Sequence, residues 1–226
     1  MARLYLVRHS QASFGMENYD QLSQLGYKQS AFIPKHFETT THFEIDALYR
    51  GDMQRHLQTA EHSFGNMQAT VIPGFNEFNH ESVLHIHRPE IADREKAMTL
   101  VMSQPDPKKF VEDEFDQAMY KWMNEEGTTA YAESFQHFKT RCVDALNQVI
   151  AESRKAKHKE VVVITSGGVI SLLMSHVLEL PLSRMNSLNT IIANTSVTCL
   201  LFNDDRITLR YFNNYSHLPK DLVTFF

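Results

Sequence analysis

The stretch LYLVRHS, residues 4–10, is the clearest architectural signal in the chain. Leu4–Val7 is a short, unbroken apolar run, which is typical of a strand buried on both faces of a sheet. The run ends abruptly in Arg8 and His9. A second run of this kind, VVVITSGG at residues 161–168, ends in Ser166 and two glycines. We therefore expect two central strands with polar residues at their carboxyl ends.

Strand and helix patterns alternate along most of the chain. Further strands are expected at 47–49 and 71–72, and helices after Leu22 (with Ser23 as the N-cap) and at 53–64, 134–150 and 169–178. Runs at 196–202 and 206–213 predict a hairpin at an antiparallel edge. The pattern predicts an α/β fold, a three-layer α/β/α sandwich around a mostly parallel sheet. Ligands of such sheets bind beyond the carboxyl ends of the strands.

Residues 82–130 differ from the rest, because they are rich in charged residues and methionine and contain three prolines. Five apolar residues recur there at helical spacing: Val111, Phe115, Met119, Trp122 and Met123. We predict a single domain over residues 1–226 with a helical insertion at about 82–130. This insertion is either a lid over the active site or an amphipathic helix pair with no catalytic role.

Composition and charge narrow the class of protein. Of the 226 residues, 42% are hydrophobic and 22% charged, which argues against disorder. The net charge of −5 offers no general attraction to nucleic acid or anionic lipid. No stretch approaches the ~20 apolar residues of a membrane span, and the first apolar run is too short for a signal peptide. Two separated cysteines favour a reducing compartment. We expect a cytoplasmic protein that binds neither nucleic acid nor membranes.

Arg8 and His9 suit chemistry on a phosphoryl group. A neutral imidazole is a competent nucleophile near pH 7, because its ordinary pKa is about 6.5. An arginine side chain offers a planar fork of donors to the phosphoryl oxygens. Arg55, at the expected start of a helix, can reach a bound anion at the helix N-terminus. Each signal is weak alone, since Arg-His pairs occur by chance and helix arginines are commonly solvated.

Taken in order, these segments resemble the histidine phosphatase superfamily, also called phosphoglycerate mutase-like. The segments that carry the resemblance are LVRHSQ (6–11), LSQLG (22–26), RHLQTA (55–60), AES (132–134) with Arg141 after it, ITSGGVI (164–170), NTSVT (194–198) and residues 213–218. The resemblance implies that His9 accepts the phosphoryl group and that Glu77 protonates the leaving oxygen. It also implies a phosphate pocket made by Arg8, Arg55, Ser166 and Gly167. An exposed loop glutamate is the alternative for Glu77.

The chain departs from the family pattern at two positions. Ser10 stands where the family has glycine, so that its Cβ crowds the phosphate site or its hydroxyl donates to the phosphate. Ser166 stands where the family has a second histidine, and loss of a preorganised donor typically costs about 10²–10³-fold in rate. Ser166 therefore predicts a slow enzyme, a compensated enzyme or a non-catalytic relative.

Other histidines are candidates for the missing imidazole or for a metal site. His80 lies three residues beyond Glu77 and would share a face with it in a helix, so it is an auxiliary candidate for the missing imidazole; a surface histidine is the alternative. His56 and His62 lie six residues apart, off a common helical face. His85 and His87 lack partners at ligand spacing, so no metal site is expected.

The resemblance implies a phosphatase that hydrolyses a small phosphomonoester through a phosphohistidine on His9, with inorganic phosphate as product and no metal or cofactor. One alternative is a phosphomutase of the same family, although residues 11–14 do not match the usual mutase continuation. Another is a catalytically impaired protein that binds a phosphorylated ligand, which Ser166 favours. The substrate and the oligomeric state stay open; a homodimer is one alternative, because the apolar tail at 222–226 can pack on the core or on a second subunit.

Overall fold

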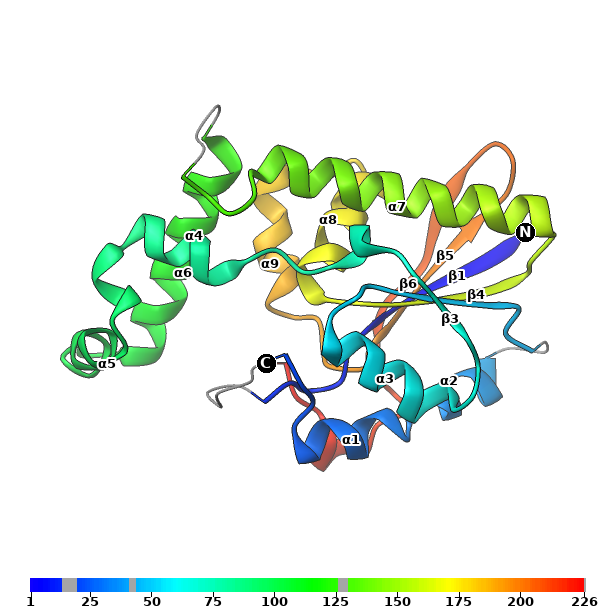
Figure 1. The fold of residues 1–226 in the computed structure, drawn as a ribbon, viewed down its shortest axis with the longest axis horizontal. Coiled ribbons are helices and arrows are strands. Elements are labelled where there is room, and N and C mark those ends of the chain that lie inside the picture. The colour runs from blue at the N-terminus through cyan, green and yellow to red at the C-terminus, as the bar shows by residue number, and fades with distance from the viewer. Residues whose placement is uncertain (14–19, 41–43, 126–129, 226) are drawn as a thin grey trace. The chain divides into compact units, whose positions relative to one another are not determined.

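The computed structural model describes residues 1–13, 20–40, 44–125 and 130–225 (Figure 1). The chain forms two compact units. The first combines Met1–Glu77 with Arg141–Phe226, and the second is Phe78–Thr140. The second unit contains the stretch 82–130 that differs in composition and extends beyond it on both sides.

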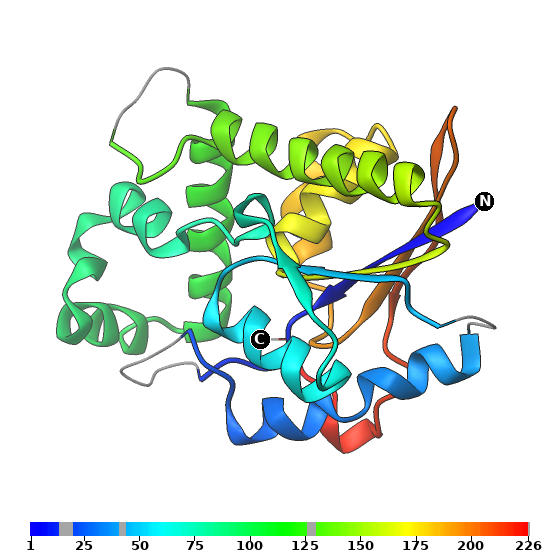
Figure 2. The ribbon, with the colours of Figure 1, turned by 45° about the vertical axis from the view of Figure 1, so that its right-hand side comes forward.

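The first unit is built on a six-stranded sheet in the order β3-β2-β4-β1-β5-β6. The strands are β1 (Ala2–Arg8), β2 (Ala47–Arg50), β3 (Ala69–Val71), β4 (Glu160–Thr165), β5 (Val197–Phe202) and β6 (Ile207–Asn214). The first four in this order pair in parallel, and β5 and β6 add an antiparallel edge. Figures 1 and 2 show α1, α2 and α3 on one face, and α8 with the later part of α7 on the other. The predicted α/β/α sandwich with a mostly parallel sheet is confirmed.

The two central strands are buried because both of their faces are covered by helices. Every residue of β4 is buried, as is the Leu4–Val7 run of β1. The register pairs Val7 with Ile164 and Arg8 with Thr165. His9 and Ser166 therefore follow at the same edge of the sheet, as expected for parallel strands that end level with each other.

The α-helices of the first unit are α1 (Gln24–Ser30), α2 (Ile33–Thr40), α3 (Gln54–Phe64), α8 (Gly167–Val177), α9 (Met185–Asn189) and most of α7 (Phe135–Ala156). The first residues of α7 belong to the second unit. The predicted N-cap of α1 is confirmed, because Ser23 Oγ accepts the Gly26 N–H at 3.0 Å. Helix α7 continues six residues past the predicted end at Ile150. The buried face of α7 includes Ser153. Because serine is polar, a prediction from the spacing of apolar residues ends the helix before it.

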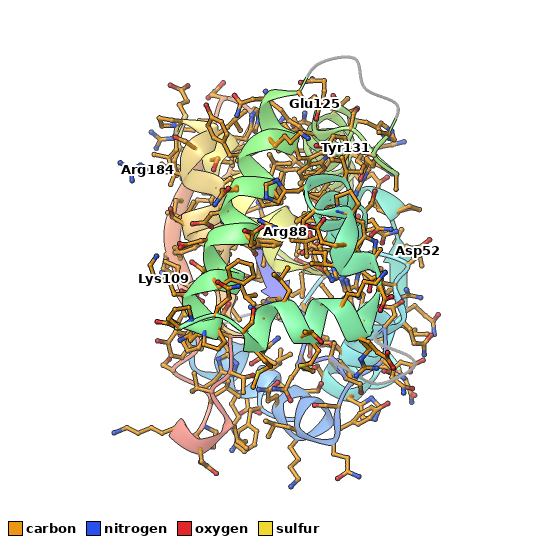
Figure 3. The ribbon with its side chains drawn as sticks, turned by 90° about the vertical axis from the view of Figure 1, so that its left-hand side faces the viewer. Asp52, Arg88, Lys109, Glu125, Tyr131 and Arg184 are labelled. Atoms are coloured by element: carbon orange, nitrogen blue, oxygen red, sulfur yellow. The ribbon has the colours of Figure 1, made fainter. Side chains whose placement is uncertain are left out.

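The second unit contains α4 (His80–His87), α5 (Arg94–Met102), α6 (Pro107–Asn124) and the start of α7. Trp122 is buried and stacks on Phe78, with ring centroids 4.8 Å apart. Arg88, labelled in Figure 3, donates to both carboxylate oxygens of Glu114 at 2.6 and 2.7 Å and so ties α4 to α6. The predicted apolar stripe of α6 is buried only toward its C-terminal end, because Val111 is 49% exposed.

No helix within the described ranges has the length and apolarity that crossing a membrane requires.

Two histidines of the first unit are held neutral, and this predicts loss of stability in acid. His36 Nε2 lies 2.7 Å from the Tyr211 hydroxyl, and the rings of His36 and His217 lie 5.5 Å apart. Burial lowers the pKa of each imidazole to about 4, and the neighbouring His217 also lowers that of His36. Between pH 6.5 and 4 the unfolded chain binds more protons, so stability falls as the pH falls through this window.

Lowering the pH from 7 to 5 is expected to cost about 2 kcal/mol through His36, from the roughly 1.4 kcal/mol per pKa unit. Urea unfolding of the wild type and of His36→Phe at both pH values measures this, because the variant cannot titrate at position 36. A drop of the same size in the variant would show that His36 does not cause it.

Candidate active site

The backbone of His9 is fixed on one side by β4 and on the other by the loop that precedes β5 (Asn194 and Thr195). The His9 N–H donates to Thr165 O at 2.8 Å, which continues the pairing of β1 with β4. From the other side, the Thr195 N–H donates to Arg8 O at 3.1 Å and Asn194 Nδ2 donates to His9 O at 3.2 Å. The His9 side chain is only 5% exposed. The imidazole therefore occupies a defined position at the carboxyl end of β1.

One hydrogen bond sets the tautomer of the His9 ring. His9 Nδ1 lies 2.7 Å from Ser10 O. A carbonyl oxygen can only accept, so Nδ1 is the nitrogen that carries the proton in a neutral ring. His9 Nε2 then carries the lone pair, which is the arrangement that a nucleophilic imidazole requires.

The surroundings of His9 favour the neutral ring. Burial is the largest cause that lowers its pKa, and the positive charges of Arg55 and then Arg8 lower it further, to well below the ordinary value. The neighbouring His56 acts in the same direction. The ring is therefore unprotonated near neutral pH, and the same cations that hold it neutral attract an anion.

Arg55 lies at the start of α3, where an acidic side chain holds it. The Arg55 side chain is 4% exposed, and Nη1 donates to Asp20 Oδ1 at 2.9 Å. Asp20 Oδ2 accepts the Gln54 N–H at 2.9 Å, so this carboxylate also caps the helix. Asp20 was not among the predicted site residues.

Thr59 joins α3 to the loop that follows β1. Its Oγ1 accepts the Ser10 N–H at 3.1 Å and donates to Arg55 O at 2.7 Å.

Arg8 lies against the start of α8. Its Nη1 donates to Phe225 O at 2.8 Å and also to Ile192 O. A Cβ at Gly167 would meet Asn189 Oδ1 at 2.5 Å and Arg8 Nε at 3.6 Å. A side chain at Gly167 would therefore clash with Asn189, whereas its contact with Arg8 would be an ordinary van der Waals contact, and the Arg8 guanidinium lies next to the first residue of α8.

Ser166 is paired with a histidine that sequence reasoning missed. His56 Nε2 lies 2.8 Å from Ser166 Oγ, and both residues are fully buried. The His56 and His9 rings lie 5.7 Å apart. Burial, followed by the charges of Arg55 and Arg50, lowers the pKa of His56 well below the ordinary value. An imidazole therefore does lie beside Ser166, and it comes from the first turn of α3.

Glu77 caps the same helix that Ser166 begins. Its Oε2 accepts the Gly168 N–H at 2.9 Å, in the first turn of α8, where a carboxylate is favoured by the helix dipole. Helix α4 begins only at His80, with Asn79 as N-cap. Glu77 therefore lies outside that helix, so the condition for a face shared with His80, a helix that contains both residues, is not met. His80 belongs to the second unit, and its auxiliary role stays a prediction.

The Ser10 hydroxyl is used in packing. Ser10 Oγ lies 2.7 Å from Ser30 Oγ, which donates to Gly26 O at 3.0 Å. Both serines are fully buried. The Ser10 side chain is thus accommodated against α1.

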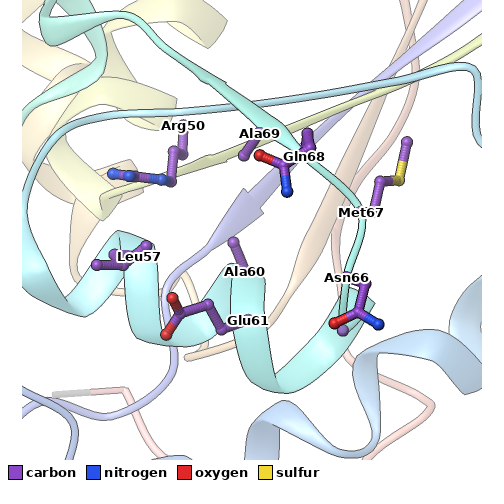
Figure 4. A pocket seen from close by; sticks show the side chains of 9 residues that line it. Arg50, Leu57, Ala60, Glu61, Asn66, Met67, Gln68 and Ala69 are labelled. Atoms are coloured by element: carbon purple, nitrogen blue, oxygen red, sulfur yellow. The ribbon is translucent and has the colours of Figure 1, made fainter.

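A separate hollow lies between α3 and the β2–β3 edge (Figure 4). Its lining residues are Arg50, Leu57, Ala60, Glu61, Gly65, Asn66, Met67, Gln68 and Ala69. None of the residues around His9 lines it. Among the described residues, no group of three or more histidine, cysteine or acidic side chains is placed to hold a metal ion.

The fold and the site define an α/β protein with a buried histidine and two neighbouring arginines at the strand ends. The family model of the histidine phosphatase superfamily (branch 1) matches residues 4–215, and the chain belongs to this superfamily. A comparison with curated proteins gives no match.

Solved structures share the fold at low sequence identity. Phosphoserine phosphatase from Entamoeba histolytica is 18% identical with a TM-score of 0.67, over 97% of this chain and 100% of that chain. Phosphoglycerate mutase from Bacillus anthracis is 15% identical with a TM-score of 0.66, over 96% and 94%. A mycobacterial glucosyl-3-phosphoglycerate phosphatase, solved with inorganic phosphate, is 16% identical with a TM-score of 0.65, over 97% and 100%.

Proposed function

We propose that this protein is a cytoplasmic phosphatase that hydrolyses a small phosphomonoester in two steps, through a phosphohistidine on His9. One observation carries the proposal. The bond from His9 Nδ1 to Ser10 O leaves the lone pair on Nε2, in a buried ring that Arg55 and Arg8 hold neutral. Membership of the histidine phosphatase superfamily supports the same reading.

In the first step His9 Nε2 attacks phosphorus, so that an N–P bond forms as the bond from phosphorus to the ester oxygen breaks. The departing alkoxide takes a proton from Glu77, since an unprotonated alkoxide leaves poorly. The hydrogen bond from the Gly168 N–H to Glu77 Oε2 supports the position of this group, because it holds the carboxyl at the first turn of α8, two residues beyond Ser166. Since Oε2 accepts that bond, the proton that is given to the alkoxide is carried by Oε1.

In the second step water attacks phosphorus and gives its proton to the Glu77 carboxylate. The N–P bond breaks, inorganic phosphate leaves, and His9 returns to its neutral form. Through both steps Arg8 and Arg55 neutralise the phosphoryl oxygens, with Ser166 and Gly167 beside them. Neither step needs a metal ion or a cofactor.

Two other functions use the same site. A phosphomutase would pass the phosphoryl group back to an organic acceptor, and one of the similar structures is a phosphoglycerate mutase. Conversion of one phosphoglycerate isomer to the other, faster than phosphate release, would establish that function. A protein that only binds a phosphorylated ligand would show neither reaction.

The proposal is tested by trapping the phosphoenzyme. The protein is mixed with ³²P-labelled p-nitrophenyl phosphate and quenched within milliseconds to seconds. We expect label that is stable to alkali and released by acid, as an N–P bond is, and peptide mass spectrometry should place it on His9. Turnover with label on a serine or carboxylate, or with none on His9, contradicts the mechanism. Absence of both label and turnover contradicts the function.

A further inference from the structure

The Ser166 side chain does not cap the helix that its residue begins. Ser166 is the N-cap residue of α8, yet its hydroxyl makes no cap hydrogen bond. The hydroxyl instead lies 2.8 Å from His56 Nε2. Serine at an N-cap normally accepts a backbone N–H of the first turn, and here Glu77 takes the Gly168 N–H. The hydroxyl is therefore available for another role.

Within the part of the chain that the structure describes, the His56 side chain makes no hydrogen bond beyond this contact. Its Nδ1 is buried and has no partner among the described residues. A Cβ at Gly51 would lie 2.4 Å from Nδ1, so the backbone passes close against that edge of the ring and holds it in place. A fully buried imidazole with one unsatisfied nitrogen is costly, which calls for an explanation.

The pair lies beside the nucleophile. The rings of His56 and His9 are 5.7 Å apart. Ser166 directly follows Thr165, whose carbonyl accepts the His9 N–H at 2.8 Å. Gly167, the next residue, approaches the Arg8 guanidinium. The Ser166–His56 pair thus lies next to His9, and the residues on either side of Ser166 contact His9 and Arg8.

The direction of the hydrogen bond decides what the hydroxyl offers. When His56 Nε2–H donates to Ser166 Oγ, the hydroxyl proton can turn toward a third atom, and an oxygen of a phosphoryl group is a strong acceptor. When Ser166 donates to Nε2, only oxygen lone pairs face that group. A bound phosphoryl group therefore selects the tautomer with the proton on Nε2, and the two bonds in series strengthen each other.

We propose that His56 is a positioning residue that acts through Ser166, and that the two residues together form a second donor to the phosphoryl oxygens. This proposal rests on the proposed phosphatase function. Ser166 alone offers a hydroxyl that can rotate freely. In the pair, the hydrogen bond from His56 orients the Ser166 hydroxyl as a donor. His56, rather than His80, is then the histidine that compensates for serine at position 166.

The test measures turnover of an aryl phosphate and the affinity for vanadate, which mimics the phosphoryl group in transfer. Its variants are His56→Ala, His56→Gln, Ser166→Ala and the double variant His56→Ala/Ser166→Ala. Loss of the donor is expected to lower kcat about 10²-fold in Ser166→Ala and about 10-fold or more in His56→Ala. The double variant should be no worse than Ser166→Ala, because His56 acts only through that hydroxyl.

His56→Gln separates positioning from packing, because its side-chain amide can place an N–H near the position of Nε2. We expect it to recover most of the kcat lost in His56→Ala. The matched control is His62→Gln, an exposed histidine on the same helix, which should leave kcat unchanged. Thermal unfolding monitors the fold of each variant, and if His56→Ala does not fold, His56→Gln and Ser166→Ala decide.

Additive losses in the double variant, or unchanged kcat and vanadate affinity in His56→Ala, overturn the proposal. Failure of the phosphatase function looks different, because the wild type itself would not turn over. In that case vanadate affinity alone decides: equal affinity in the wild type, His56→Ala and Ser166→Ala rejects the pair, and a shared, non-additive loss supports it.

Discussion

Replacing His9 with alanine is expected to abolish the phosphoenzyme and to lower kcat for an aryl phosphate by roughly 10³-fold or more, as seen when a nucleophile is removed from a hydrolase. The physical reason is that Nε2 of this ring is the nitrogen with the lone pair directed away from the Ser10 carbonyl. Arg8 and Arg55 cannot replace it, because guanidinium groups remain protonated and cannot attack phosphorus. Rapid-quench labelling and steady-state assays with the same substrate measure both effects.

The fold should tolerate this change. The hydrogen bond of the ring to Ser10 O is a local one, while the strand contacts of His9 use its backbone. Vanadate or phosphate affinity should therefore fall much less than kcat, since Arg8 and Arg55 stay in place. His62→Ala is the matched control, because His62 is exposed on α3. Turnover that survives His9→Ala at the wild-type rate would falsify the assignment of the nucleophile.

The strands at the centre of the sheet could be predicted because burial on both faces requires an unbroken apolar run in the middle of each strand. Leu4–Val7 and Val161–Ile164 are unbroken apolar runs, and both are fully buried. Their shared carboxyl edge followed from parallel pairing. The short edge strand β3 was misplaced by about two residues, at 71–72 instead of Ala69–Val71, because an exposed strand of three residues carries almost no burial pattern.

Site residues could be proposed from the sequence where a segment resembles the family, as at Arg8, His9 and Arg55. The His56–Ser166 contact could not, because it joins residues that are 110 positions apart and no local pattern records such a pairing. Asp20 is likewise 35 positions from Arg55. The start of α4 did have a local signal: Asn79 is an N-cap type of residue, and its side chain accepts the Ser82 N–H, which places Glu77 outside the helix.

Replacing Arg55 with alanine is the prediction with the next largest effect. We expect kcat/KM to fall about 10²–10³-fold, because a buried guanidinium beside the phosphoryl group stabilises charge far better than water does. The pKa of His9 should rise at the same time, since the positive charge of Arg55 is the largest cause after burial that lowers it. Steady-state kinetics and an NMR titration of the His9 ring measure the two effects separately.

The variant Asp20→Asn separates the effect of the Arg55 charge from the effect of its ion pair with Asp20. The exchange removes the ion pair at 2.9 Å but leaves the Arg55 charge in the site, and the Asp20 side chain is 39% exposed. Partly exposed pairs contribute about 0–1 kcal/mol, so we expect a loss in kcat/KM of less than roughly tenfold. Arg55→Lys keeps the charge without the planar fork and should fall between the two. Equal losses in Arg55→Ala and Asp20→Asn would mean that the ion pair, and not the guanidinium charge at the anion site, is what the site requires.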